Sequence, residues 1–366
     1  MQRIISFILI SILLFSFPFS SEAATGAFLV MDGRTKSVLE ESNGNAKLPM
    51  ASTTKVMTAM VVLEQVGLEE IIEIPQQVVG VEGTSLYLKK GERYTVKELL
   101  YGLMLQSAND CAEALAWYAG NGDVSAFVGL MNEKAKSLGL KNTKFANPSG
   151  LPAEGHYTTA KELALIMYYA MKDSQFKKIT ATKQFVIHGQ TIVNHNKLLK
   201  LYPDCIGGKT GYTIAAGRCL VSVAERRGVP LICVTLGIRD DWNIHTNAYE
   251  KWFGKVENVV LEERSAFSVK LRVAGGGTVI AKNCDKVLAS LFNSNKKIEK
   301  KVKASPYIFG NKQIGDVVGT VEYWLDSYKF GESPLVLEQS IETSMKKELF
   351  ITGIIRFFRR ILLKKE

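Results

Sequence analysis

The chain has 366 residues, of which 46% are hydrophobic and 22% charged, a balance typical of a globular protein long enough for two domains. No nucleic-acid-binding motif accompanies its net charge of +10. We therefore expect no nucleic-acid partner, and an anionic cell envelope fits such a charge equally well. Its five cysteines and four histidines show no metal-ligand spacing, so we predict no metal and no cofactor.

The first 23 residues are predicted to be a signal peptide. Arg3 precedes an almost unbroken apolar run over residues 4–19, and small residues lead up to a cleavage site after Ala23,. The alternative is a retained membrane anchor, but the run is shorter than the roughly 20 residues of a spanning helix. In either case the rest of the chain is exported.

Residues 24–255 are predicted to form an α/β domain. Two strands, at 26–31 and 37–41, form a hairpin that turns at Asp32 and Gly33,. A helix from about residue 52 to 66 is apolar around much of its circumference and is therefore expected to be buried. Three strands, at 208–213, 219–224 and 231–237, indicate an antiparallel meander covered by a helix over 242–253.

Two capping boxes are predicted between these strands. Thr95 with Glu98 opens one helix, and Thr159 with Glu162 opens another over residues 163–171,. A further helix runs from Asp123 to a stop at Gly139. Strands occur at both ends of the domain, with helices between them. This order suggests one sheet in which strands from the start of the domain join strands from its end.

The remaining residues have a different pattern. Short alternating runs between residues 256 and 338 predict a small all-β domain,. Residues 339–366 predict an amphipathic helix that lies in a membrane interface, with a packed partner protein as the alternative. Its apolar face comprises Phe350, Ile351, Ile354, Ile355, Phe357, Phe358, Ile361 and Leu362, and its basic face Arg356, Arg359 and Arg360. We therefore expect the protein at the outer face of the cytoplasmic membrane, held peripherally by this helix.

Three short motifs in the α/β domain carry chemistry. They are Ser52-Thr53-Thr54-Lys55, Ser107-Ala108-Asn109 and Lys209-Thr210-Gly211. Ser-x-x-Lys alone is uninformative because it also occurs at Ser174, Ser294 and Ser344, whereas the other two motifs each occur once. In this order the three predict a serine acyl-transfer site whose base is a lysine.

The first motif supplies a nucleophile and a base. On a helix, Ser52 and Lys55 lie one turn apart on the same face. Lys55 can take the serine proton only if its pKa is lowered, which burial and the nearby cation Lys209 would both do. The alternative is a capping serine followed by a surface lysine, but the apolar residues that follow favour a buried Lys55.

The other two motifs supply polar groups around a cleft. Ser107 could relay a proton and Asn109 could hydrogen-bond a peptide group, with helix capping as the alternative. Lys209 and Thr210 could bind a carboxylate beside an extended substrate. Arg239 could add a guanidinium fork, and its alternative is a surface salt bridge with an adjacent aspartate,.

Together, the motifs resemble the active site of the serine D-alanyl-D-alanine carboxypeptidases, the low-molecular-mass penicillin-binding proteins. The resemblance extends to residues 147–151 with 155–157, to 194–199 and to 236–239. It also covers the β-rich region and the amphipathic tail. It implies a serine β-lactamase/DD-peptidase-like domain, with a five-stranded antiparallel sheet flanked by helices.

The resemblance also implies a role for each residue. Ser52 would attack the penultimate D-alanine carbonyl of a peptidoglycan pentapeptide, with Lys55 as general base, and β-lactams would acylate the same serine. The oxyanion would lie between the backbone N–H groups of Ser52 and Tyr212. The other implied site residues are Ser107 and Asn109 for proton transfer and orientation, and Lys209, Thr210, Gly211, Tyr212 and Arg239 for substrate binding.

Two rival functions would share these motifs and can be compared with the carboxypeptidase. A class A β-lactamase would need a Glu-x-x-Leu-Asn segment between the second and third motifs, and this sequence has none. A penicillin-binding sensor or peptidoglycan-binding paralogue would be acylated without turnover, and would be expected to carry a signalling domain or several membrane spans. Ala108 and Tyr212 depart from residues common in the family, which leaves the deacylation rate and the substrate preference open.

Overall fold

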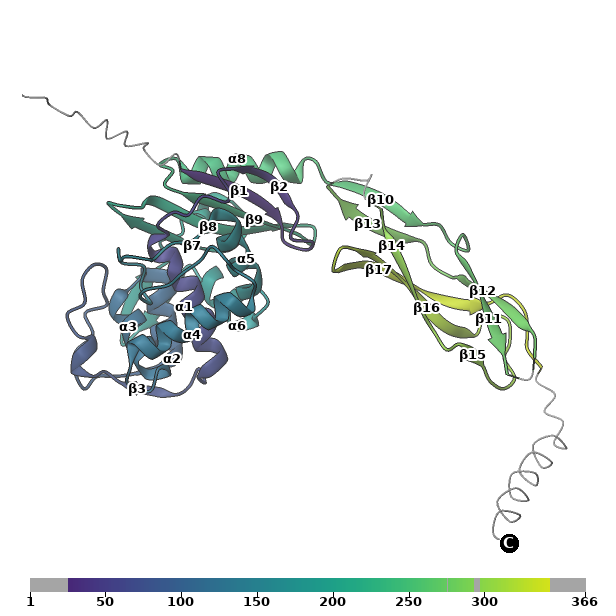
Figure 1. Cartoon of the computed structure of the whole chain (residues 1–366), viewed down its shortest axis with the longest axis horizontal. Coiled ribbons are helices and arrows are strands. Elements are labelled where there is room, and N and C mark those ends of the chain that lie inside the picture. Colours follow the sequence, from purple (N-terminus) through teal and green to yellow (C-terminus); the bar gives the residue numbers. More distant parts are fainter. Residues whose placement is uncertain (1–25, 275, 293–296, 343–366) are drawn as a thin grey trace, which may run out of the picture.

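The computed structural model describes residues 26–274, 276–292 and 297–342 (Figure 1). An α/β domain is followed by an elongated β domain, and the predicted boundary at residue 255 falls in the short link between them. The predicted signal peptide lies outside the described residues, as does the predicted tail helix beyond residue 342. In the described part of the chain no helix is long and apolar enough to cross a membrane.

The α/β domain is built on one five-stranded antiparallel sheet. The strand order is β2-β1-β9-β8-β7, and β1 pairs along its whole length with β9. The predicted meander, and its closure by the first strand, are therefore confirmed. The strands are β1 (Ala27–Asp32), β2 (Val38–Ser42), β7 (Cys205–Thr213), β8 (Gly217–Arg226) and β9 (Val229–Leu236).

Alternating side chains on these strands enter two separate cores. On β8, Leu220 packs into a core with Tyr249 and Phe253 of α8 (Asp241–Phe253), while Val221 joins the larger core under the helical layer. This period of two places a helix-covered apolar face on each side of the sheet. The helical layer consists of α1 (Lys55–Gln65), α2 (Val96–Tyr101), α3 (Asn109–Ala119), α4 (Val124–Ser137), α5 (Ala160–Ala170) and α6 (Ser174–Ala181). The short α7 (Leu198–Leu201) packs with α8 in the other core.

The predicted capping box at Thr95 is confirmed, and it fixes the start of α2. The Thr95 hydroxyl accepts from the Glu98 N–H at 3.2 Å, and the Glu98 carboxylate accepts from the Thr95 N–H at 2.8 Å. After α2 the chain makes a π-helical turn, Gly102–Gln106, and ends it at Ser107 in the left-handed conformation. The second motif therefore lies at a break between helices, as predicted.

The second predicted capping box is only half right. Thr159 accepts from the Glu162 N–H at 3.1 Å, but Glu162 does not reach back to it. The buried Glu162 carboxylate instead accepts from the N–H of Lys141 at 3.0 Å and from the Thr143 hydroxyl at 2.6 Å. These contacts are to a loop distant in sequence, so the local Thr-x-x-Glu pattern could not reveal them.

Two short hairpins were not predicted. They are β3 (Ile71–Glu73) with β4 (Arg93–Thr95), and β5 (Gln184–Ile187) with β6 (Gln190–Val193). Strands of three or four residues give too few alternations to stand out from loop sequence. The second hairpin leads directly into the wall of the site described below.

The β domain has a six-stranded sheet in the order β14-β16-β17-β12-β11-β15 and a two-stranded sheet of β10 and β13. Arg34 connects this domain to the first one. It pairs with the buried Asp32 at 3.0 Å and donates to the Ser290 carbonyl at 2.6 Å, with its guanidinium close to two phenylalanine rings. The strands are β10 (Glu257–Glu262), β11 (Ser268–Val273), β12 (Thr278–Asn283), β13 (Val287–Leu291), β14 (Glu299–Ala304), β15 (Tyr307–Ile308), β16 (Val317–Leu325) and β17 (Tyr328–Leu337).

Candidate active site

The first two motifs meet at the amine of Lys55. Ser52 lies in a 3₁₀ turn, Ala51–Thr54, and Lys55 opens α1 directly after it. The Lys55 amine is 3.0 Å from the Ser52 hydroxyl, 2.7 Å from the Asn109 side-chain oxygen and 2.5 Å from the Ser149 carbonyl. An ammonium has three N–H donors, and here each has an oxygen acceptor.

Burial gives Lys55 the lowered pKa that a general base would require. Lys55 is 0% exposed, and desolvation lowers its pKa well below the usual value of 10.5, with the charge of Lys209 lowering it further,. In its neutral form the amine has a lone pair within hydrogen-bonding distance of the serine proton. This is the arrangement required to activate a hydroxyl nucleophile without histidine.

Lys209 is the second buried amine. It is 1% exposed on β7, and burial lowers its pKa to about 7. Its amine donates to the Thr210 carbonyl at 3.0 Å. A lysine that titrates near neutral pH is charged below that pH and neutral above it, so its attraction for an anion depends on pH within the physiological range.

Gly211 lets β7 approach the nucleophile. A Cβ at this position would lie 2.9 Å from the Ser52 nitrogen and 3.1 Å from the Thr53 nitrogen, both closer than side-chain carbons normally come. The sequence predicted Gly211 as a substrate-binding residue. The structure adds that any larger residue would push the strand away from the serine turn.

Asn109 and Ser107 occupy different places. The Asn109 amide group is buried, donates to the Glu82 carbonyl at 2.7 Å and accepts from Lys55, so Asn109 holds the base in position. Ser107 lines the cavity instead, with a left-handed φ of 64°. Backbone strain of this kind costs about 1–3 kcal/mol and is concentrated at functional sites.

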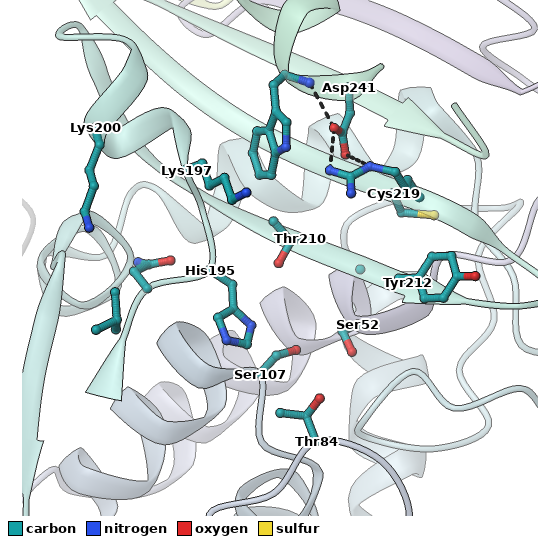
Figure 2. Close-up of a pocket in the computed structure, with 15 residues that line it drawn as sticks. Ser52, Thr84, Ser107, His195, Lys197, Lys200, Thr210, Tyr212, Cys219 and Asp241 are labelled. Atoms are coloured by element: carbon teal, nitrogen blue, oxygen red, sulfur yellow. Dashed lines mark hydrogen bonds and ion pairs between the residues drawn. The ribbon is translucent and has the colours of Figure 1, made fainter. Parts of the chain in front are cut away.

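The site opens into a cavity of about 600 Å³. Figure 2 shows Ser52, Ser107 and Tyr212 at one end, with Thr210 midway along β7. Lys55, Asn109 and Lys209 lie behind the residues that line the cavity, since all three are buried and none of them lines it. The Ser52 hydroxyl is thus accessible to a ligand, while the Lys55 amine is shielded from water.

The structure does not bring Arg239 into this cavity. Arg239 is exposed in the turn after β9, beyond Gly237, whose φ is +70°. Arg218 of β8 lines the cavity in its place. Two of its guanidinium nitrogens bind the buried Asp241, at 3.1 and 2.7 Å. The predicted alternative for Arg239, a salt bridge with Asp240 or Asp241, is not observed either among the described residues.

A loop over residues 146–156 supports the serine turn. Asn147 accepts from the N–H groups of Ser149 and Gly150 at 3.2 and 2.7 Å. His156 accepts from the Ala146 N–H at 3.0 Å, so its other ring nitrogen carries the proton and donates to the Thr54 hydroxyl at 2.7 Å. Burial lowers the pKa of His156 to about 4, which keeps the ring neutral. The sequence singled out this loop but not these contacts, which depend on distant neighbours.

Comparison with known proteins identifies the family. A family model for D-alanyl-D-alanine carboxypeptidase matches residues 16–240. The chain belongs to this family. It is 30% identical to D-alanyl-D-alanine carboxypeptidase DacF of Bacillus subtilis, over 97% of this chain and 98% of that protein.

Solved structures support the same family assignment. A D-alanyl-D-alanine carboxypeptidase from Mycobacterium tuberculosis is 34% identical with a TM-score of 0.59, covering 62% of this chain and 90% of that one. The enzyme DacD from Francisella tularensis matches 86% of this chain and 93% of its own with a TM-score of 0.62. Its 24% identity shows the fold alone. The predicted family, enzyme class and fold are confirmed, and the roles of individual residues stay predictions.

We expect Gly150→Ala to slow acylation of Ser52 about 100-fold, the usual cost of displacing a reacting group by about 1 Å. A Cβ at Gly150 would lie 2.0 Å from the Ala51 carbonyl oxygen, so either the serine turn or the Ser149 contact to Lys55 must move. The measurement is the rate of labelling by a fluorescent penicillin.

Gly155→Ala is the matched control for this substitution. Gly155 lies in the same loop and also has a positive φ, of +74°, but its added Cβ would meet only the end of the Lys144 side chain at 3.4 Å. Equal slowing by the two substitutions would show that loop strain, and not displacement of the serine turn, is responsible.

Proposed function

We propose that this protein is a serine DD-carboxypeptidase that removes the terminal D-alanine from peptidoglycan pentapeptides through an acyl-enzyme on Ser52. The observation that carries the proposal is the buried Lys55 amine, 3.0 Å from the Ser52 hydroxyl and with a lowered pKa. The family supplies the reaction class, and the relatives named above are carboxypeptidases.

Acylation follows from these positions. Lys55 takes the proton of Ser52 as the serine oxygen attacks the penultimate D-alanine carbonyl. The developing oxyanion lies between the backbone N–H groups of Ser52 and Tyr212, a contribution often worth about 3–4 kcal/mol. Ser107 passes a proton to the departing D-alanine amine, and water then hydrolyses the ester. A β-lactam ring would open on the same serine.

The terminal carboxylate would bind at the middle of the cavity. Thr210 supplies a hydroxyl there, and Lys209, whose amine donates to the Thr210 carbonyl at 3.0 Å, supplies a charge. We assign the guanidinium to Arg218 and not to Arg239, because Arg218 lines the cavity. Its pairing with Asp241 uses Nε and Nη2 and leaves Nη1 for the substrate.

The cellular site is part of the proposal. An N-terminal export signal and a basic amphipathic tail would place the enzyme at the outer face of the cytoplasmic membrane, where its substrate lies,. The β domain would then separate the catalytic domain from the lipid surface. The rival function, a penicillin-binding sensor without turnover, is distinguished by the first experiment below.

Residues 24–338 should release D-alanine from diacyl-Lys-D-Ala-D-Ala. Ser52→Ala should abolish this release because, in the part of the chain that the structure describes, Ser52 supplies the one hydroxyl that is hydrogen-bonded to the Lys55 amine. Free D-alanine is measured over time, and a thermal unfolding scan checks that the variant is folded. Penicillin labelling of the wild-type protein without D-alanine release would instead support the sensor.

Arg218→Lys should lower kcat/KM for this peptide about tenfold or more. A lysine keeps a cation beside Asp241 but lacks the Nη1 donors that a guanidinium offers to the substrate carboxylate. A hydrogen bond to a charged group contributes about 1.5–3 kcal/mol. Arg239→Lys is the matched control and should change kcat/KM less than about twofold, because surface substitutions away from a site have small effects. A larger loss at Arg239 would restore the assignment made from sequence.

The pH dependence of kcat/KM should be bell-shaped. Lys55 must be neutral to act as base, so activity rises as pH rises through its lowered pKa. Lys209 must be protonated to attract the carboxylate, so activity falls as pH rises through about 7. The profile is measured between about pH 5 and about pH 10, which covers the expected fall near pH 7 and the acid side of it,. Lys209→Arg should remove the falling limb, and a falling limb that persists in that variant would refute the assignment.

A further inference from the structure

The cavity extends beyond the position of the terminal carboxylate. Figure 2 shows Lys197 and Lys200 on the side of Thr210 away from Ser52 and Tyr212, and both lysines line the same 600 Å³ cavity. They come from the segment between β6 and the end of α7. A D-alanine residue, whose side chain is one methyl group, would leave this part of the cavity empty.

These lysines have no acidic partner among the described residues of the cavity. Asp241 is the single acidic residue there, and Arg218 already binds both of its oxygens. Lys197 and Lys200 are exposed. This end of the cavity therefore carries uncompensated positive charge.

Hydrogen bonds hold the segment in place. The Asn194 side chain donates to the Thr182 carbonyl at 2.9 Å and accepts from the Asn196 N–H at 2.9 Å. Between them, the His195 N–H donates to the Leu105 carbonyl at 3.0 Å, which ties the segment to the π-helical turn that precedes Ser107. The backbone that carries the two lysines is thus fixed relative to the proton-relay serine.

The direction of the substrate identifies which end this is. Ser107 gives its proton to the leaving amine, and Thr210 and Arg218 bind the carboxylate of the same residue. The leaving group would therefore occupy the part of the cavity from Ser107 to Thr210, and a side chain longer than a methyl group would extend toward Lys197 and Lys200. The acyl part of the substrate extends the opposite way, past Tyr212.

We infer that the leaving-group end of the cavity accepts a residue larger than D-alanine that carries a second carboxylate. This inference rests on the proposed function and extends its substrate class. Two peptide sources share the chemistry: a stem peptide that ends in an acidic D-residue, and a cross-linked stem in which the leaving amine belongs to a diamino acid with its own carboxylates. Cleavage of the second source would be an endopeptidase activity.

The chemical step is the same for every leaving group. The amide bond between the D-alanine carbonyl and the leaving amine breaks as the Ser52 ester forms, and the serine proton is delivered to the amine. Water then cleaves the ester and returns a proton to the enzyme. No further reactant is needed.

The test compares diacyl-Lys-D-Ala peptides that end in D-Glu, D-Gln or D-Ala. The wild-type kcat/KM for D-Glu should exceed that for its neutral isostere D-Gln about tenfold at low salt, the scale expected for two exposed charge contacts at roughly 6 Å. The ratio should shrink at about 1 M salt, where the Debye length is about 3 Å.

The double variant Lys197→Gln, Lys200→Gln should bring this ratio close to one while leaving D-Ala-D-Ala hydrolysis and penicillin labelling within about twofold of wild type. Lys136→Gln is the matched control, because Lys136 is exposed on α4 and does not line the cavity. It should leave the ratio unchanged.

A wild-type ratio near one, or a ratio unchanged in the double variant, would overturn the inference while D-Ala-D-Ala hydrolysis keeps the proposed function intact. If the wild-type protein shows neither penicillin labelling nor D-alanine release, the proposed function and this inference are both overturned. A further arm uses a D-Ala-diaminopimelate linkage: its cleavage assigns the site to cross-linked stems, and cleavage of D-Glu peptides alone assigns it to terminal acidic residues.

Discussion

The amine of Lys55 is enclosed by protein and still has three oxygen acceptors, and the catalytic domain is arranged around this contact. An ammonium removed from water is strongly disfavoured, so burial shifts the equilibrium toward the neutral amine that the chemistry requires. The acceptors come from three separate segments, at Ser52, Asn109 and Ser149. A movement of any one of them changes both the position and the pKa of the base.

Close backbone contacts hold those segments together. Gly211 brings β7, and with it Lys209, against the serine turn, and Gly150 brings the supporting loop against the same turn from another direction. Ala51 and Ser107 have left-handed φ angles of 46° and 64° although neither is glycine. Such strain persists only where the surrounding structure holds the backbone in place, and here it falls at Ser107 and at the residue before Ser52,.

Sequence patterns predicted the features that local chemistry encodes. The closed sheet followed from alternation on β1, β7, β8 and β9, and the three motifs followed from residue types at fixed spacing. Arg218 could not be found in this way, since its place in the cavity depends on its register opposite Tyr212 on β7. Glu162 was misread for a related reason: its partners are about 20 residues away in sequence, and a capping pattern describes only neighbours.

The lysines of the site fall into two groups that burial separates. Lys55 and Lys209 are enclosed, and desolvation lowers the pKa of both amines, that of Lys209 to about 7. Lys197 and Lys200 are exposed at the far end of the cavity, where we assign them to an anionic ligand. A neutral base needs the first environment, because burial disfavours the ammonium form. The same burial makes the charge of Lys209 depend on pH near neutrality, whereas the two exposed lysines meet a ligand from the solvent side. The cavity therefore combines buried amines that can lose a proton with an exposed cationic end.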